Sequence, residues 1–197
     1  MKKSTALLIT GSCLIVGGAA LGYAPLTEYW RSKHVGQVLT VPFSTAVAEA
    51  APRVETPSQV ISGKPVRIQI PALGIDLQIA DGRYSAANQT WTLSKDKAHY
   101  ALTTPPANNA EGNTFIYGHN RKGVFNTLNR IKPGDEAIVS TDNGHRLTYK
   151  FRTAYETEPT DNSLFAYKGA PILTLQTCSG MWYQNRQLFT FGFESVQ

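Results

Sequence analysis

Cys178 is the residue whose sequence context best fits covalent chemistry. It follows an apolar, β-rich run over residues 172–177, and runs of this length and composition are typical of strands. The only other cysteine, Cys13, lies in an apolar N-terminal segment, so a disulfide between the two is not expected. A lone cysteine at a strand end is usually a small buried hydrophobe, and it becomes a candidate nucleophile when a histidine can reach it.

Among the histidines, His119 is the best candidate partner for that thiol. Like Cys178, it comes directly after a predicted strand, here residues 114–118, and two such residues can meet at one rim of a barrel. Gly118 allows a close backbone approach or an unusual turn just before it. A single histidine at such a place is more often structural than catalytic, so the prediction rests on the pair. The other histidines are His34 in the expected tether, His99, which could be packed or exposed, and His145 after a tight turn.

Arg186 is the third candidate because it opens the strand predicted to follow Cys178. An antiparallel return of the chain after residues 179–185 would bring its guanidinium back to the same rim. A guanidinium there can donate two hydrogen bonds to a carbonyl or to a developing oxyanion. The commoner role of a lone arginine at such a place is to anchor a strand end in solvent.

The residues from 64 onward are typical of a β domain. Short apolar or alternating runs predict strands over residues 66–70, 75–79, 113–117, 136–140, 145–153, 172–177 and 187–193. A tight turn is expected at Asp142-Asn143-Gly144, and a short helix over residues 125–130 that ends near Pro133. Seven or eight short strands with little helix favour a closed barrel or a sandwich, and closure would remove exposed strand edges.

Residues 1–30 predict a membrane anchor. Lys2 and Lys3 precede an almost uncharged run over residues 5–24, which as a helix is long enough to span a hydrocarbon core of about 30 Å. The lysines favour a cytoplasmic N-terminus. A cleaved signal peptide, or a lipoprotein signal acylated at Cys13, are the alternatives. All three place the rest of the chain outside the cytoplasm, and the preferred one is a single-pass membrane protein with an extracellular domain.

Residues 31–63 predict a tether between this anchor and the domain at 64–197. They show no clean period, and Pro42, Pro52, Pro57 and Gly63 interrupt them. A stalk is the simpler interpretation, and a lid over the domain is the alternative. Exported proteins that use cysteine for stability carry it in pairs. A single cysteine on an exported domain cannot stabilise it by cross-linking, which favours a functional role for Cys178.

The charge distribution argues against a nucleic-acid partner. The net charge is +5, but residues 1–33 hold four of the 19 Lys and Arg residues and one of the 14 Asp and Glu residues. The remainder is therefore nearly balanced, which does not resemble the basic footprint of a DNA- or RNA-binding surface.

Several stretches together resemble the sortases, the cysteine transpeptidases of bacterial surfaces. Residues 174–178 followed by Arg186 are similar to the TLxTC…R signature of that family. The segment that carries the family's histidine is matched by His99-Tyr100, Pro105-Pro106 and residues 112–120, with further likeness at residues 125–128, 131–135 and 158–164. The likeness covers about residues 64–194, and its order and spacing make it specific.

The resemblance implies an all-β fold, a closed eight-stranded barrel with short helices preceded by an N-terminal transmembrane helix. It also implies that His119, Cys178 and Arg186 lie at one end of that barrel. Cys178 would attack a peptide carbonyl in a C-terminal sorting signal of LPxTG type and form a thioester. An amine of the cell wall or of a pilin would then take over the acyl group. The expected partners are surface proteins with a sorting signal, the acceptor amine and the membrane.

The chain departs from the family pattern in two places, the residues that flank the histidine and the tether. Many sortases have Ala-Gly-His-Arg where this chain has Tyr117-Gly118-His119-Asn120. No Asp-Pro-aromatic lid motif of the pilus-building members occurs in the tether, which favours a housekeeping-like or other non-pilin class. No cofactor or metal is expected: the spacing of His, Cys and carboxylates suggests no ligand cluster, and nothing requires the calcium that some relatives use.

Two rival enzymes fit less well, and one non-enzyme remains open. An L,D-transpeptidase would have a histidine two residues before its cysteine, where this chain has Gln176. A papain-like protease would have its cysteine at a helix start. The alternative from another class is a non-catalytic, membrane-tethered β-barrel that binds a wall or protein ligand.

Overall fold

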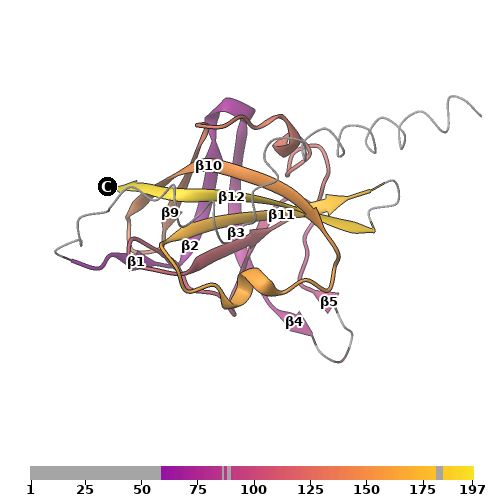
Figure 1. The fold of residues 1–197 in the computed structure, drawn as a ribbon, viewed down its shortest axis with the longest axis horizontal. Coiled ribbons are helices and arrows are strands. Elements are labelled where there is room, and N and C mark those ends of the chain that lie inside the picture. The colour runs from indigo at the N-terminus through magenta and orange to yellow at the C-terminus, as the bar shows by residue number, and fades with distance from the viewer. Residues whose placement is uncertain (1–58, 86, 88–89, 181–183) are drawn as a thin grey trace, which may run out of the picture.

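The computed structural model describes residues 59–85, 87, 90–180 and 184–197, which form a closed eight-stranded β-barrel (Figure 1). Around the barrel the strands follow the order β10, β12, β11, β8, β6, β3, β2 and β9. The elements in chain order are β1 (Ser62–Gly63), β2 (Pro65–Ile70), η1 (Pro71–Leu73), β3 (Ile75–Gly82), β4 (Tyr84–Ser85), β5 (Thr90–Trp91), β6 (Ala98–Ala101), β7 (Ala107–Asn108), β8 (Asn113–Tyr117), η2 (Leu128–Arg130), β9 (Glu136–Thr141), β10 (Arg146–Thr157), η3 (Ser163–Ala166), β11 (Ile172–Ser179) and β12 (Asn185–Val196). The prediction of an all-β fold with a closed barrel is confirmed.

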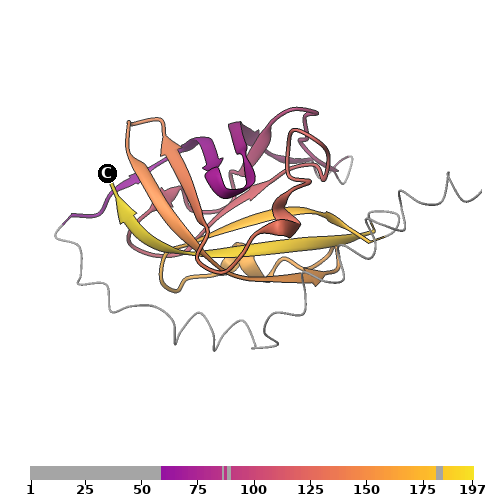
Figure 2. The same ribbon diagram turned by 90° about the horizontal axis from the view of Figure 1, so that it is seen from above.

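Two of the barrel's strand pairs are parallel, β3 with β6 and β8 with β11. The other neighbouring pairs are antiparallel. Strands β10, β11 and β12 lie side by side along the length of the barrel in both views (Figure 1, Figure 2). Because parallel strands have their C-terminal ends at one edge, the pairing of β8 with β11 brings the residues that follow both strands together.

The barrel interior is filled by alternate residues of its strands. Along β11, Leu173 and Leu175 are fully buried in this core, and on β12 Phe189 and Phe191 face them. Successive strand residues point to opposite faces, so this alternation places residues 174, 176 and 178 on the outer face of the same strand. The side chain of Cys178 therefore lies outside the barrel core.

A second apolar cluster covers part of the outer face. It contains Phe115 and Tyr117 of β8, Leu188 of β12 and Leu164 of η3, and Trp91 packs against it. β8 is consequently buried on both faces, because Ile116 between the two aromatic residues points into the barrel core. Residues 115–117 of this strand are all aromatic or aliphatic for this reason.

Several elements depart from the sequence expectation. The helix expected over residues 125–130 is the 3₁₀ turn η2, since too few residues separate Gly123 from Pro133 for α-helix to propagate. β6 and the β4–β5 hairpin, which projects from the barrel in Figure 1, were not expected. The tight turn at residues 142–144 is confirmed, and Gly144 has the positive φ of 89° that such a turn requires.

The end of the expected tether lies against the domain. β1 pairs with β7, and the backbone of Ile61 exchanges hydrogen bonds with Asn109, whose N–H and side chain both take part. Residues 59–63 are therefore fixed to the barrel. The expected membrane anchor and most of the tether fall outside the described residues.

No helix in the described part of the chain has the length and apolar character needed to cross a membrane.

Candidate active site

Cys178 and Arg186 are direct cross-strand neighbours. β11 and β12 run antiparallel, and the register places the Cα of Cys178 opposite that of Arg186. Residues opposite each other in such a pair have side chains on the same face, with Cβ atoms about 4.5–5.5 Å apart. Both residues are half-buried, and the Cys178 thiol is free. The chain thus places one thiol and one guanidinium side by side on the outer face of the barrel.

His119 lies two residues beyond the last parallel pair of β8 and β11, which joins Tyr117 to Gln176. The loop that carries it is fixed to the cysteine strand on both sides of His119. Before it, the Gly118 N–H donates to the Gln176 carbonyl at 3.0 Å, and the Thr177 hydroxyl donates to the Gly118 carbonyl at 3.0 Å.

After His119, the side-chain amide of Asn120 donates to the Cys178 carbonyl at 3.0 Å. Asn120, one of the departures from the family pattern noted in the sequence, thus binds the backbone of the cysteine itself. The backbone of His119 is therefore placed between two attachments to residues 176–178. Among the described residues, no hydrogen bond joins its ring to the thiol.

Gly118 is required by the packing of the loop that follows it. A Cβ at this position would lie 3.0 Å from the side chains of both Val124 and Phe125, which is closer than side chains normally approach. Val124 and Phe125 are buried in the barrel core, and the Phe125 N–H donates back to the His119 carbonyl at 3.2 Å. The loop can approach β8 this closely only because residue 118 has no side chain.

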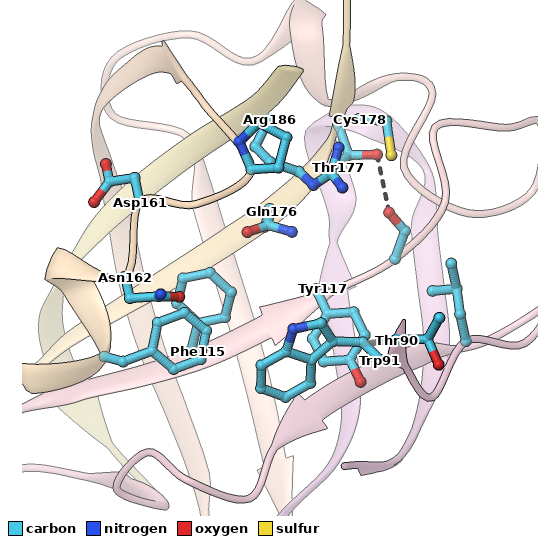
Figure 3. A pocket seen from close by; sticks show the side chains of 14 residues that line it. Thr90, Trp91, Phe115, Tyr117, Asp161, Asn162, Gln176, Thr177, Cys178 and Arg186 are labelled. Atoms are coloured by element: carbon cyan, nitrogen blue, oxygen red, sulfur yellow. Dashed lines mark hydrogen bonds between the residues drawn. The ribbon is translucent and has the colours of Figure 1, made fainter. Parts of the chain in front are cut away.

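A pocket of about 310 Å³ opens on the outer face beside Cys178 and Arg186 (Figure 3). Of the three predicted site residues, Cys178 and Arg186 line it and His119 does not. In Figure 3 the two lie at one end of the pocket, and the rings of Phe115, Tyr117 and Trp91 lie at the other. The Arg186 Nη1 donates to the Asn185 carbonyl at 3.1 Å, which helps to orient the guanidinium.

The far end of the pocket is aromatic. The ring centroid of Trp91 lies 5.3 Å from that of Tyr117 and 5.6 Å from that of Phe165, and Phe165 stacks on Phe115 at 4.5 Å. These rings come from β5, β8 and η3, so three separate segments form one apolar surface. The arrangement suits an extended ligand with a carbonyl at the Cys178 end and an apolar side chain at the other.

The electrostatics of the site favour a neutral imidazole and an ionised carboxylate. Burial, followed by the nearby Arg121 guanidinium and His99 imidazole, lowers the pKa of His119 below its usual range. The backbone N–H of Ser163, with further hydrogen bonds from Ser163 and Thr157, lowers the pKa of Asp161, which lines the pocket. The pocket lining therefore includes an ionised carboxylate as well as the Arg186 guanidinium.

The described residues contain no group of three or more His, Cys, Asp or Glu side chains that could hold a metal ion.

Sequence reasoning singled out three chemical groups, of which the structure pairs Cys178 with Arg186, and it missed the residues that position them. Asn120 and Thr177 act through single hydrogen bonds across β8 and β11, which depend on strand register and leave no sequence signal. The aromatic end of the pocket was also missed. Tyr117 could have been found, because it shares the outer face of β8 with Phe115 two residues earlier.

A family model and solved structures both relate the chain to the sortases. The family model described as Sortase domain matches residues 68–192. A search of curated proteins gave no match.

Solved structures of sortases are similar to the chain in fold. Sortase A of Listeria monocytogenes aligns with a TM-score of 0.56 and 20% sequence identity over 68% of this chain and 89% of that one. Sortase E1 of Streptomyces coelicolor, solved with a tripeptide in its active site, gives 0.54 and 21% over 69% and 90%. Sortase C-1 of Actinomyces oris gives 0.53 and 25% over 67% and 76%.

The link between Thr177 and Gly118 can be tested with two matched variants on one strand. Thr177→Val removes the donor to a buried carbonyl and should lower the free energy of unfolding by about 1–3 kcal/mol. Thr174→Val is the control, since the Thr174 hydroxyl is buried and has no hydrogen-bond partner among the residues that the structure describes. That change should be neutral or stabilising. Urea unfolding of both variants measures the difference, and equal effects would contradict the assigned role of Thr177.

The charge of Arg121 should be visible in the titration of His119. Arg121→Ala removes a positive charge that disfavours the imidazolium, so the pKa of His119 should rise. For any reaction step that requires neutral His119, the acidic limb of the pH–rate profile should then move to higher pH. NMR titration of the His119 ring measures the shift, with Lys122→Ala as the control for loss of a neighbouring exposed charge. An unchanged or lowered pKa in the Arg121 variant would refute this assignment.

Proposed function

The chain belongs to the sortase family, and from that membership we propose that it is a cysteine transpeptidase that cleaves a C-terminal sorting signal of LPxTG type. The observation that carries the proposal is the direct cross-strand pairing of Cys178 with Arg186 at a pocket. The parallel pairing of β8 with β11 supports a role for His119 at the same edge. The tripeptide in the active site of sortase E1 supports a peptide as the substrate class.

In the acylation step Cys178 attacks the carbonyl carbon of the scissile peptide bond. An ordinary thiol is only a few per cent ionised at neutral pH, so His119 takes the thiol proton and provides the thiolate. The carbonyl oxygen gains negative charge in the tetrahedral intermediate, and the Arg186 guanidinium donates hydrogen bonds to it. The C–N bond then breaks, the leaving amine takes the proton from the His119 imidazolium, and a thioester on Cys178 remains.

In the transfer step an amine of the cell wall or of a pilin attacks the thioester carbonyl. Neutral His119 accepts the proton of that amine, and the lowered pKa of its ring keeps the neutral form abundant at pH 7. The C–S bond breaks and the Cys178 thiolate leaves, so that a new amide joins the surface protein to its acceptor. The His119 imidazolium then returns its proton to the Cys178 thiolate, so that thiol, imidazole and guanidinium are back in their starting states.

The N-terminal segment completes the proposal. The uncharged run over residues 5–24, preceded by Lys2 and Lys3, supports a single-pass anchor with the barrel outside the cell. Sorting-signal proteins and wall precursors are substrates met at that surface. Residues 31–58 would then connect the anchor to the barrel.

The acyl-enzyme is the direct test of this function. Wild-type protein incubated with LPxTG-type peptides should gain the mass of the acyl fragment on Cys178, and Cys178→Ala should gain none while unfolding at the same temperature. Peptide mapping by mass spectrometry locates the adduct. No adduct with any peptide, together with a Cys178 thiol inert to alkylating reagents at neutral pH, would favour a non-catalytic binding barrel instead.

The planar guanidinium of Arg186, with its paired N–H donors, provides a second test. Arg186→Lys keeps the charge but loses the paired donors, and should lower kcat/KM by about 10²–10³-fold, the usual cost of one oxyanion donor. Arg146→Lys, an exchange at an exposed position, is the matched control and should stay near wild type. Turnover of the Arg186 variant close to wild type would remove Arg186 from the mechanism.

A further inference from the structure

His99 is a buried histidine that the proposed mechanism does not use. It lies on β6 and is 2% exposed. Its Nε2 atom is 2.9 Å from the backbone nitrogen of Ser94 and 2.6 Å from the Ser94 hydroxyl, and its Nδ1 atom is 3.3 Å from the Asp81 carbonyl. Both ring nitrogens are therefore engaged by the protein.

These contacts fix the tautomer of the ring. A backbone N–H can only donate, so the Nε2 atom that faces the Ser94 N–H must be the unprotonated acceptor. The hydrogen is then on Nδ1, where it donates to the Asp81 carbonyl. The ring is therefore neutral. Its Nε2 atom accepts from the Ser94 N–H, and the Ser94 hydroxyl is placed to donate to the same atom. The ring also stacks on Tyr117, with centroids 5.5 Å apart and planes 24° apart.

The segment held by His99 is one wall of the pocket. Thr90, Trp91 and Leu93 line the pocket, and Ser94 comes directly after them. The β4–β5 hairpin consists of only two residue pairs, supplemented by hydrogen bonds between Arg83 and Thr92. Such a short hairpin is marginal by itself.

The wall is therefore fixed mainly where it meets the barrel. The Tyr117 hydroxyl donates to the Thr92 carbonyl at 2.8 Å, and His99 binds Ser94 two residues later. Tyr117 and His99 are paired residues of β8 and β6. One stacked pair of side chains thus fastens residues 92–94 to the sheet that carries the site.

We propose that neutral His99 is a positioning residue that fixes residues 90–94 as the wall of the pocket and thereby sets the affinity for the acyl-donor peptide. The inference rests on the proposed function for its substrate. His99 acts through Ser94 and Trp91 and touches no reacting atom. Its loss should therefore weaken peptide binding and leave the chemical step nearly intact.

Two substitutions separate the acceptor from the ring. In His99→Gln the side-chain oxygen can reach the place of Nε2 and accept from the Ser94 N–H. In His99→Phe the ring can still stack on Tyr117 but accepts nothing. The readouts are the hydrogen-exchange protection of the Ser94 amide and the separate kcat and KM for a sorting peptide. His145→Phe, at the turn before β10, is the control.

The Phe variant should lose Ser94 protection and raise KM about tenfold, the cost of about 1.4 kcal/mol of lost hydrogen bonding, with kcat within about twofold of wild type. The Gln variant should keep both near wild type. The Gln variant tests the proposal even if the Phe variant does not fold.

Unchanged KM and Ser94 protection in the Phe variant would overturn the proposal, as would a Gln variant that loses protection at pH 7. A wild-type protein that processes no sorting peptide would refute the proposed function alone, because Ser94 protection still decides the role of His99.

Discussion

The parallel pairing of β8 with β11 is the constraint on which the site depends. Antiparallel neighbours would place the ends of these strands at opposite edges of the barrel, whereas parallel ones place Gly118 beside Thr177. His119 directly follows Gly118, and Cys178 directly follows Thr177. The antiparallel return of β12 then adds Arg186 opposite Cys178. Backbone register thus brings Cys178, Arg186 and the loop that carries His119 to one edge of the barrel.

The register is costly to change because both faces of β8 are buried. Ile116 belongs to the barrel core, while Phe115 and Tyr117 belong to the outer cluster beneath the pocket. A shift of one residue would exchange these sets and bury neither well. The same two-sided packing lets Tyr117 serve as the floor of the pocket and as the stacking partner of His99. Stability and the shape of the pocket therefore depend on the same residues.

The sequence was sufficient to predict the barrel and the meeting of Cys178 with Arg186 at one edge, but not the residues around them. Alternation along residues 66–79 and the turn at Gly144 are local signals, so the strands they predict are found in the structure. β6 was not recognised because its four residues, 98–101, include a buried histidine and show no alternation. The roles of Asn120 and Ser94 arise from contacts across strands and loops, and no local pattern encodes them.

The proposed convergence of thiol, imidazole and guanidinium on one carbonyl can be tested directly by a crystal structure with a peptide aldehyde. The Cys178 thiol should add to the aldehyde and form a thiohemiacetal that resembles the tetrahedral intermediate. The account predicts the new oxygen about 2.7–3.0 Å from the Arg186 guanidinium, with the His119 ring on the leaving-group side. A thiohemiacetal whose oxygen points away from Arg186, with His119 turned away from the adduct, would contradict it.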